Sequence, residues 1–170
     1  MLPLLNVVAL AAMAVLMALL PLTAAAEVPW MPDAIVGRWL IASKDAVIDI
    51  HPVEGPAGSE YHGSIAWLLD KTYDRKDGPA LNGKPLLDHR NPDPALRKRP
   101  LIGLTMLKGL HFDGRDHWLD GRVYSCNDGR TYRVQVSLAD RDHLNLRGYF
   151  GLPIFGMTSV WTRVQQLPMP

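Results

Sequence analysis

The stretch that decides the fold is Asn127-Asp128-Gly129-Arg130-Thr131-Tyr132-Arg133-Val134-Gln135-Val136-Ser137-Leu138. Its first three residues tolerate positive φ angles and close tight hairpin turns. After the turn, apolar residues at 132, 134, 136 and 138 alternate with polar ones. Alternation with a period of two is typical of a strand with one buried and one solvated face. The stretch therefore predicts a hairpin that joins a strand at 123–125 to one at 130–138.

The same pattern continues on both sides of this hairpin, and no long amphipathic helix interrupts it. A loop is predicted at 52–59, which is rich in Gly and Pro. In the strand predicted at 61–69, one face is expected to point inward, and it carries Tyr61, Gly63, Ile65, Trp67 and Leu69. Further strands are predicted at 35–41, 46–51, 61–69, 101–107, on either side of a turn at Asp113-Gly114 within 109–118, at 143–147 and at 157–164.

Eight or nine strands joined in sequence order by short turns predict an all-β fold, a single antiparallel up-and-down β-barrel. Closure into a barrel pairs the first strand with the last and removes the exposed edges of an open sheet. We expect the barrel to span residues 35–164, after an extension at 27–34, with a C-terminal tail at 165–170.

One segment, residues 70–100, departs from the strand pattern and holds five of the fourteen prolines. Asp93 is a good N-cap, and Pro94 suits the first helical position because its missing N–H donor is not needed there. The segment is predicted to form a surface lobe or lid with a short helix, at one end of the barrel.

The N-terminus predicts export. Leu4–Leu20 is almost entirely apolar, and Ala24-Ala25-Ala26 supplies the small residues at which a signal peptidase cuts. We therefore expect residues 1–26 to be a signal peptide and the mature protein to be periplasmic or secreted, with no stable membrane anchor. A permanent anchor is the alternative, for which the apolar run is short against a ~30 Å hydrocarbon core.

Composition limits the classes of partner. The chain has 170 residues, of which 48% are hydrophobic and 21% charged, with a net charge of +1. This indicates one packed domain and offers no field strong enough to suggest nucleic acid or a membrane surface as the main partner. Cys126 is the one cysteine, so the chain forms no internal disulfide, and the thiol is expected to be buried and inert.

Two short motifs at the ends of the barrel sequence resemble those of lipocalins. These are Gly37-Arg38-Trp39 and Trp161-Thr162-Arg163. In lipocalins a Gly-x-Trp in the first strand and a late arginine close one end of the barrel, the guanidinium packing over the indole. The resemblance implies a structural role in barrel closure for Gly37, Trp39 and Arg163.

Six short motifs spread over the chain form a recognisable pattern. They are Gly37-Arg38-Trp39, Gly63-Ser64-Ile65-Ala66-Trp67, the run from Asn91-Pro92-Asp93-Pro94 through Arg99-Pro100-Leu101-Ile102-Gly103-Leu104, Asp128-Gly129-Arg130-Thr131-Tyr132, Leu146-Arg147-Gly148-Tyr149 and Trp161-Thr162-Arg163. This pattern resembles the DUF2147 family of small exported bacterial proteins. The resemblance implies a lipocalin-like barrel and identifies no catalytic residues. Tyr124-Ser125-Cys126 departs from the Tyr-Asp-Pro that is usual in the family.

No catalytic, metal or cofactor motif is found. The six histidines lack the HxH, HxxxH and HExxH spacings of metal sites, and His111 and His117 are the pair best placed to approach each other. Cys126 beside Asp128 has no obvious histidine base, and no nucleophile elbow, Walker loop or dinucleotide fingerprint occurs.

Two weak binding sites remain as hypotheses. Arg97 and Arg99 could hold an anion or headgroup at the barrel mouth, although cations also suit a helix C-terminus. An eight-stranded barrel holds either a filled core or one small ligand. The residues expected to line a cavity are Trp67, Leu104, Trp118, Tyr132 and Leu146, from an inward set that also includes Trp39, Ile50, Ile65, Val134 and Leu144.

Three functions are consistent with these observations. The first is a non-enzymatic protein that binds a small, largely apolar or amphipathic molecule in or at the mouth of the barrel. The second is an interaction module of the cell envelope, with the lobe as its docking surface. The third is a hydrolase or isomerase that uses polar residues at the barrel mouth.

Overall fold

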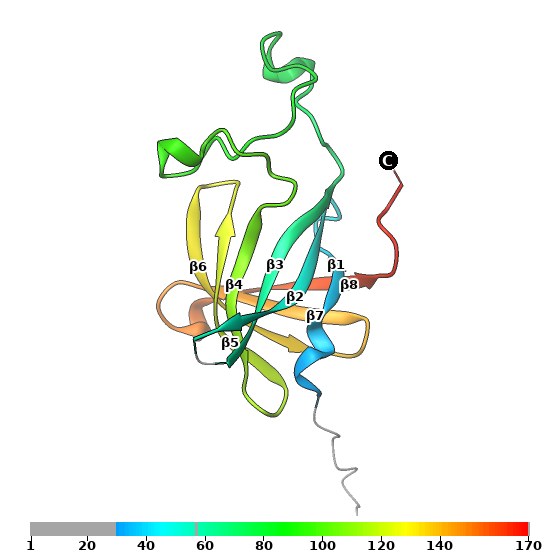
Figure 1. Ribbon diagram of the computed structural model, residues 1–170, viewed down its shortest axis with the longest axis vertical. Helices are drawn as coiled ribbons and strands as arrows, with labels where there is room; N and C mark the ends of the chain where they lie inside the picture. The colour runs from blue at the N-terminus through cyan, green and yellow to red at the C-terminus, as the bar shows by residue number, and fades with distance from the viewer. Residues whose placement is uncertain (1–29, 57, 170) are drawn as a thin grey trace, which may run out of the picture.

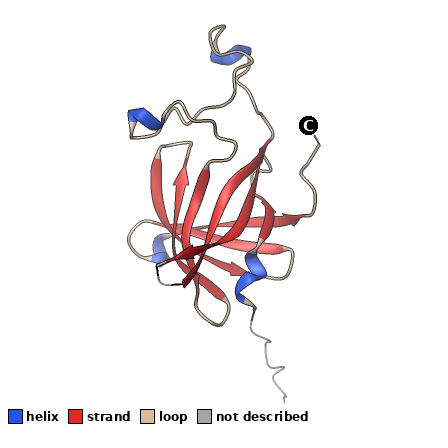
Figure 2. Ribbon diagram, in the orientation of Figure 1, coloured by secondary structure: helices blue, strands red, loops and turns tan. Residues whose placement is uncertain are grey.

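The computed structural model describes residues 30–56 and 58–169, and it is a closed barrel of eight antiparallel strands (Figures 1 and 2). The predicted all-β, up-and-down barrel is confirmed. The predicted signal peptide and its cleavage site lie outside the described residues. The strands are β1 (Gly37–Leu40), β2 (Ala46–Gly55), β3 (Gly58–Leu68), β4 (Thr105–Phe112), β5 (His117–Ser125), β6 (Arg130–Leu138), β7 (His143–Tyr149) and β8 (Met157–Val164).

Each strand pairs with its neighbour in sequence, and β1 pairs with β8 to close the cylinder. Four single turns of 3-10 helix accompany the strands: η1 (Pro32–Ile35), η2 (Arg75–Asp77), η3 (Pro94–Leu96) and η4 (Pro153–Phe155). The helical turn predicted in the long loop is η3. Its N-cap is Asp93, whose side chain accepts a hydrogen bond of 2.9 Å from the Ala95 backbone N–H.

Several predicted strand boundaries are wrong. Ile35, expected to begin the first strand, belongs to η1, and the strands expected at 101–107, within 109–118 and at 123–125 correspond to only two strands, β4 and β5. The expected loop at 52–59 is mostly strand, since β2 continues to Gly55. Pro52 is tolerated because β1 pairs with β2 only up to Ile50, so beyond that point one edge of β2 has no partner strand. Conversely, residues 101–104 form a turn closed by a hydrogen bond of 3.0 Å from Leu104 N to Leu101 O, and β4 begins at Thr105.

The inward face predicted for the third strand is correct only as far as Ile65. The register with β2 shifts between Val47 and Ile48, so that Ile65 lies opposite Ile48 but Trp67 lies opposite Val47. After this bulge Trp67 is buried but is not part of the main core cluster. Leu69, also expected inside, follows the end of β3 and is 55% exposed.

The core fills the barrel toward the end where β1 begins. Its fully buried side chains include Trp39, Trp118, Tyr61, Leu107 and Leu110. Helix η1 lies across this end, and three aromatic side chains hold it. The Trp39 and Trp118 indoles donate hydrogen bonds of 2.8 Å to the Ile35 and Pro32 carbonyls, and the Tyr61 hydroxyl donates to Asp33. We call this the closed end.

Arg163 ties the closed end together. Its guanidinium lies 4.1 Å from the centre of the Trp39 ring. It donates hydrogen bonds of 2.7–2.8 Å to the backbone carbonyls of Ala34, Val36 and Arg141. Gly37 has a φ of 122°, and a Cβ there would approach the Arg163 Nη1 to 3.1 Å. The first strand, the last strand and η1 therefore meet at one guanidinium.

Replacing Arg163 by alanine is expected to lower the free energy of unfolding by about 3 kcal/mol, because three charge-assisted hydrogen bonds and the cation–π contact are lost. Lysine has one nitrogen in place of the three that donate, so Arg163→Lys should recover only part of this loss. Urea denaturation measures both effects. The control is the exposed Arg38→Ala, which should change stability by no more than ~0.5 kcal/mol. Equal effects at positions 38 and 163 would contradict this role.

Candidate functional site: the open end of the barrel

The opposite end of the barrel is formed by the loops at 41–45, 69–104, 126–129 and 150–156. The longest of them is the predicted lobe, which extends above the barrel in Figure 1 in green. The core does not fill this open end, and several hollows lie there among the described residues, including two that share Val123 as a lining residue.

The first hollow has a volume of about 320 Å³. This lies within the range of small-molecule sites, about 300–1,000 Å³. Its wall is mainly apolar, and its polar groups include the carboxylates of Asp45 and Asp70; among the described residues that line it, none is Lys, Arg or His. The apolar side chains are Ile41, Ala46, Ile48, Ile65, Leu68, Leu86, Leu101, Met106 and Val123.

The second hollow, of about 780 Å³, is more open to solvent and lies on the side of β6, β7 and β8. Tyr132 and Leu146 line it, as do Phe150, Phe155 and Met157 from the loop between β7 and β8 and from the start of β8. Val123 lines both hollows. The two therefore adjoin at the barrel mouth.

Of the five residues expected to line a cavity, Tyr132 and Leu146 line the second hollow. The other three lie elsewhere: Leu104 and Trp118 are buried in the core cluster, and Trp67 is buried outside it. Sequence reasoning missed Ile41, Met106 and Val123, which come from three different strand ends. The alternation in 105–112 and 117–125 is broken at Gly109 and Asp120, which have positive φ, so the sequence pattern did not show which residues reach the mouth.

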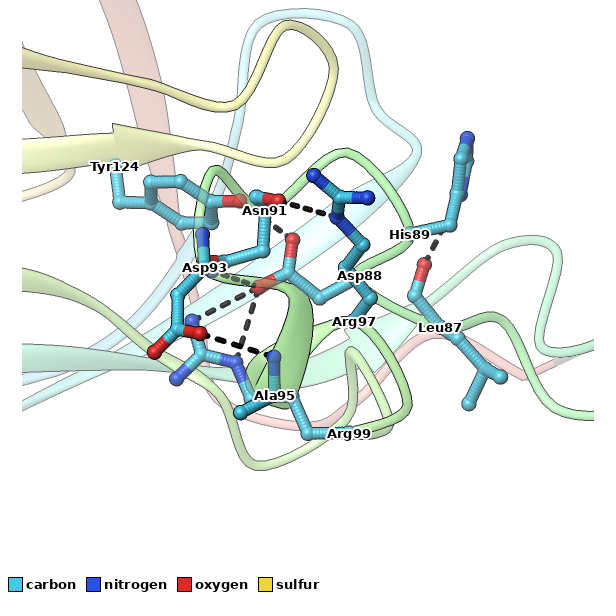
Figure 3. Close-up of polar contacts among 9 residues, drawn as sticks. All are labelled: Leu87, Asp88, His89, Asn91, Asp93, Ala95, Arg97, Arg99 and Tyr124. Atoms are coloured by element: carbon cyan, nitrogen blue, oxygen red, sulfur yellow. Dashed lines mark hydrogen bonds and ion pairs between the residues drawn. The ribbon is translucent and has the colours of Figure 1, made fainter.

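The lobe is fixed to the barrel by a buried carboxylate, Asp88 (Figure 3). Its side chain has no exposed surface. One oxygen accepts from Asn91 Nδ2 at 2.7 Å and from Arg99 at 2.8 and 3.0 Å. The other accepts from the Tyr124 hydroxyl of β5 at 2.5 Å. Asp88 thus joins the lobe to the barrel wall.

A second contact lies beside the first. Arg90 donates from Nη1 to the Asn127 carbonyl in the β5–β6 turn. Gly129, with a φ of 71°, closes this turn, and a Cβ on it would lie 2.1 Å from the Arg90 carbonyl oxygen. The turn residue predicted from the Asn-Asp-Gly pattern therefore also provides the space in which the lobe packs.

These contacts determine the protonation of the groups. Burial raises the pKa of Asp88, but hydrogen bonds from Tyr124, Asn91 and Arg99 and the charge of Arg99 outweigh it, so that the pKa is below its usual value. Burial and the hydrogen bond to Asp88 raise the pKa of Tyr124 to about 12. Neither group is poised to transfer a proton near neutral pH. The cluster is built to hold the lobe.

The arginines predicted to hold an anion are both engaged within the lobe. Arg97 donates from Nε to the Asn91 carbonyl at 2.7 Å, and Arg99 is paired with Asp88 and lies 5.9 Å from the centre of the Tyr124 ring. Neither is among the residues that line the two hollows. Their observed contacts are with the chain itself.

Three potential metal ligands, Asp113, Asp116 and His117, lie within 4.8 Å of one another at the β4–β5 turn. Asp113 accepts backbone hydrogen bonds from residues 115, 116 and 117, which accounts for its position as a turn residue. The group is largely exposed and lies at the closed end, away from both hollows. His111 lies opposite Leu119 across this hairpin.

Cys126 is partly buried and lines the first hollow. Burial, followed by the charge of Asp88, raises the pKa of its thiol to about 11. At neutral pH the side chain is a protonated thiol and acts as a small apolar group. This agrees with an inert structural cysteine.

The closed eight-stranded barrel, the helix across one end and the Trp39–Arg163 stack define a lipocalin-like protein. Protein HP1028 from Helicobacter pylori, described as belonging to the lipocalin family, has a similar structure, with a TM-score of 0.61. The match covers 81% of this chain and 85% of the HP1028 chain, and the two sequences are 22% identical. The chain belongs to the family of uncharacterized proteins conserved in bacteria called DUF2147, whose sequence model matches residues 37–163. No curated protein matches the sequence significantly. Among the described residues, no helix has the length and apolar character needed to cross a bilayer.

Asp88→Asn is expected to loosen the lobe while the barrel stays folded, because the charge-assisted bonds from Arg99 are lost, at a cost of about 2 kcal/mol. Limited proteolysis should then cut within residues 70–100 at far lower protease concentration. Because the folded-state pKa of Asp88 is depressed, its stabilisation is complete above the unfolded pKa of about 4 and is lost as pH falls through the folded pKa. The control is Asp74→Asn, which removes an exposed carboxylate charge within the same lobe and keeps a side chain that can cap η2. Cleavage of the two variants at the same rate would refute the anchoring role of Asp88.

Cys126 is expected to react with iodoacetamide at pH 8 about a hundredfold more slowly than an ordinary thiol, because so little thiolate is present. Mass spectrometry of timed samples gives the rate. The protein unfolded in urea should react at the ordinary rate and serves as the control. Rapid modification of the folded protein would show that the thiol is neither buried nor protonated.

Proposed function

We propose that this protein binds a small, largely apolar molecule at the open end of its barrel, as an exported binding protein of the periplasm or the extracellular space. The observation that carries the proposal is the hollow of about 320 Å³, walled by aliphatic side chains from β2 to β5, by Ile41 after β1, and by Leu86 and Leu101 of the loop between β3 and β4. Burial of an apolar ligand there would be favoured by ~25 cal/mol per Å² of surface removed from water.

The polar groups of the hollow indicate which end group the molecule would carry. Asp45 and Asp70 are exposed at the rim, and no cation lines the hollow among the described residues. A carboxylate ligand would be repelled there, although solvent screens the effect at these exposed positions. A neutral or cationic end group fits better, with Ser43, Ser125 and Asn127 as hydrogen-bonding partners.

Binding is favoured over catalysis by the state of the polar groups near the hollow. Asp88 is saturated with hydrogen bonds, and the raised pKa values of Tyr124 and Cys126 keep both groups protonated at neutral pH, so that neither supplies a nucleophilic anion. Export is supported by the apolar run and the alanine triplet before Glu27.

The test compares a straight-chain alcohol, an amine and a carboxylate of equal length by isothermal titration calorimetry. The alcohol and the amine are expected to bind more tightly than the carboxylate. Val123→Trp places a large ring between the two hollows and should weaken binding at least about tenfold, or ~1.4 kcal/mol. Ile102→Trp is the control, since Ile102 is 45% exposed and lines neither hollow.

Native mass spectrometry of the protein purified from its exporting host complements the titration by revealing a co-purified molecule. If no bound mass appears and no member of the panel binds, the proposed function is wrong. If the carboxylate binds most tightly, the barrel site stands but the assigned end group is wrong.

A further inference from the structure

The loop between β7 and β8 presents large apolar side chains to solvent. Residues 148–162 contain no charged side chain. In Figure 1 this loop, in orange, projects from the side of the barrel. The exposed residues are Phe150 (83%), Leu152 (63%), Ile154 (76%), Phe155 (79%) and Met157 (84%). Such a concentration of exposed apolar surface indicates a contact with a partner or a membrane.

The loop is held in this conformation by its own hydrogen bonds. Arg147 donates to the Pro153 carbonyl at 2.8 Å, to the Thr158 hydroxyl at 2.9 Å and to the Ile154 carbonyl at 3.3 Å. Gly156 packs so closely on β7 that a Cβ would lie 2.6 Å from the Gly148 carbonyl oxygen. The apolar side chains therefore extend outward from a braced turn.

A row of cations crosses the outer wall of the barrel and ends at this loop. Lys108 of β4 lies opposite Arg122 of β5, and Arg122 lies opposite Arg133 of β6. Arg133 in turn lies over the ring of Tyr149, at 5.7 Å, where β7 enters the loop. All three cations are exposed, and within residues 30–56 and 58–169 none of them forms an ion pair.

Like charges directly opposite one another destabilise a sheet. The row therefore favours an anionic partner, which would relieve the repulsion. We call the row and the residues from Phe150 to Met157 together the docking face. It combines fixed positive charge with apolar side chains that project from the wall beside it.

We propose that the docking face binds the surface of a bilayer that contains anionic lipid, with the loop inserted among the headgroups and the three cations over the phosphates. At the surface of such a bilayer, negatively charged headgroups lie directly above apolar acyl chains, so both kinds of contact are available side by side. A second copy of this chain fits less well, because a two-fold contact through the loop would bring the same cationic rows together. This inference goes beyond the proposed function, since docking does not require a ligand in the barrel.

The location of the docking face connects it with the barrel mouth. Phe150, Phe155 and Met157 also line the second hollow. A docked barrel would therefore present that hollow to the lipid, and an apolar molecule could pass between the two without crossing water.

The test is co-sedimentation of the purified protein with vesicles of phosphatidylcholine alone and with vesicles that also contain phosphatidylglycerol. We expect binding to the anionic vesicles, weakened by salt. Arg122→Gln and Arg133→Gln should each lower the partition coefficient about fivefold. Ile154→Ser with Phe155→Ser should abolish binding without loss of fold, because both side chains are more than three-quarters exposed.

Matched controls lie on the lobe. Leu69→Ser removes another exposed apolar side chain, and Arg75→Gln another exposed cation, and neither should change vesicle binding. Equal binding to neutral vesicles, no binding to either kind, or a dimer that the double serine variant dissociates would each overturn the proposal. Val123→Trp should block the barrel ligand yet leave vesicle binding intact, so failure of one proposal is distinguishable from failure of the other.

Discussion

The structure depends on the guanidinium of Arg163. This planar group has several donors in fixed directions, so it donates hydrogen bonds to carbonyls of η1, of the residue after it and of the β6–β7 turn at the same time. Its face covers the Trp39 indole. The contact joins β8 to β1 and holds η1 across one end. Because Trp39, Trp118 and Tyr61 all bond to η1 or its flank, that end is filled with aromatic rings. The two hollows that adjoin at Val123 both lie at the other end.

The sequence predicts strands well where one face is buried and the other solvated over the whole strand. The segment 130–138 is such a case, with Val134, Val136 and Leu138 buried between partly or fully exposed neighbours. Prediction fails where three-dimensional context decides. Pro52 sits in a strand because β1 is short, and the side on which Trp67 lies depends on a bulge opposite residues 47 and 48. Neither fact has a local signal, because each depends on the length or register of a different strand.

The candidate site was less predictable than the fold. The helical turn η3 could be predicted from Asp93, because an N-cap bonds to residues next to it in the sequence. Asp88, in contrast, is bound by Tyr124, 36 residues away, and nothing around Asp88 in the sequence marks it as buried. The loop 150–156 shows the opposite difficulty. Its apolar residues are plain in the sequence, but composition alone does not separate a buried strand end from an exposed projection, and only the turn braced by Arg147 shows which it is.

The lobe is anchored on one side of the barrel mouth. The Asp88–Tyr124 and Arg90–Asn127 contacts fix it over the β5–β6 side, where Leu86 and Leu101 wall the first hollow. Opening that side would leave the buried Asp88 carboxylate without the hydrogen bond from Tyr124, which would raise the free energy of the protein. Among the described residues, no hydrogen bond joins the lobe to β6, β7 or β8, and the second hollow on that side meets the first at Val123 of β5. A molecule held in the barrel as proposed could reach the interior past Phe150 and Met157 without breaking either lobe contact.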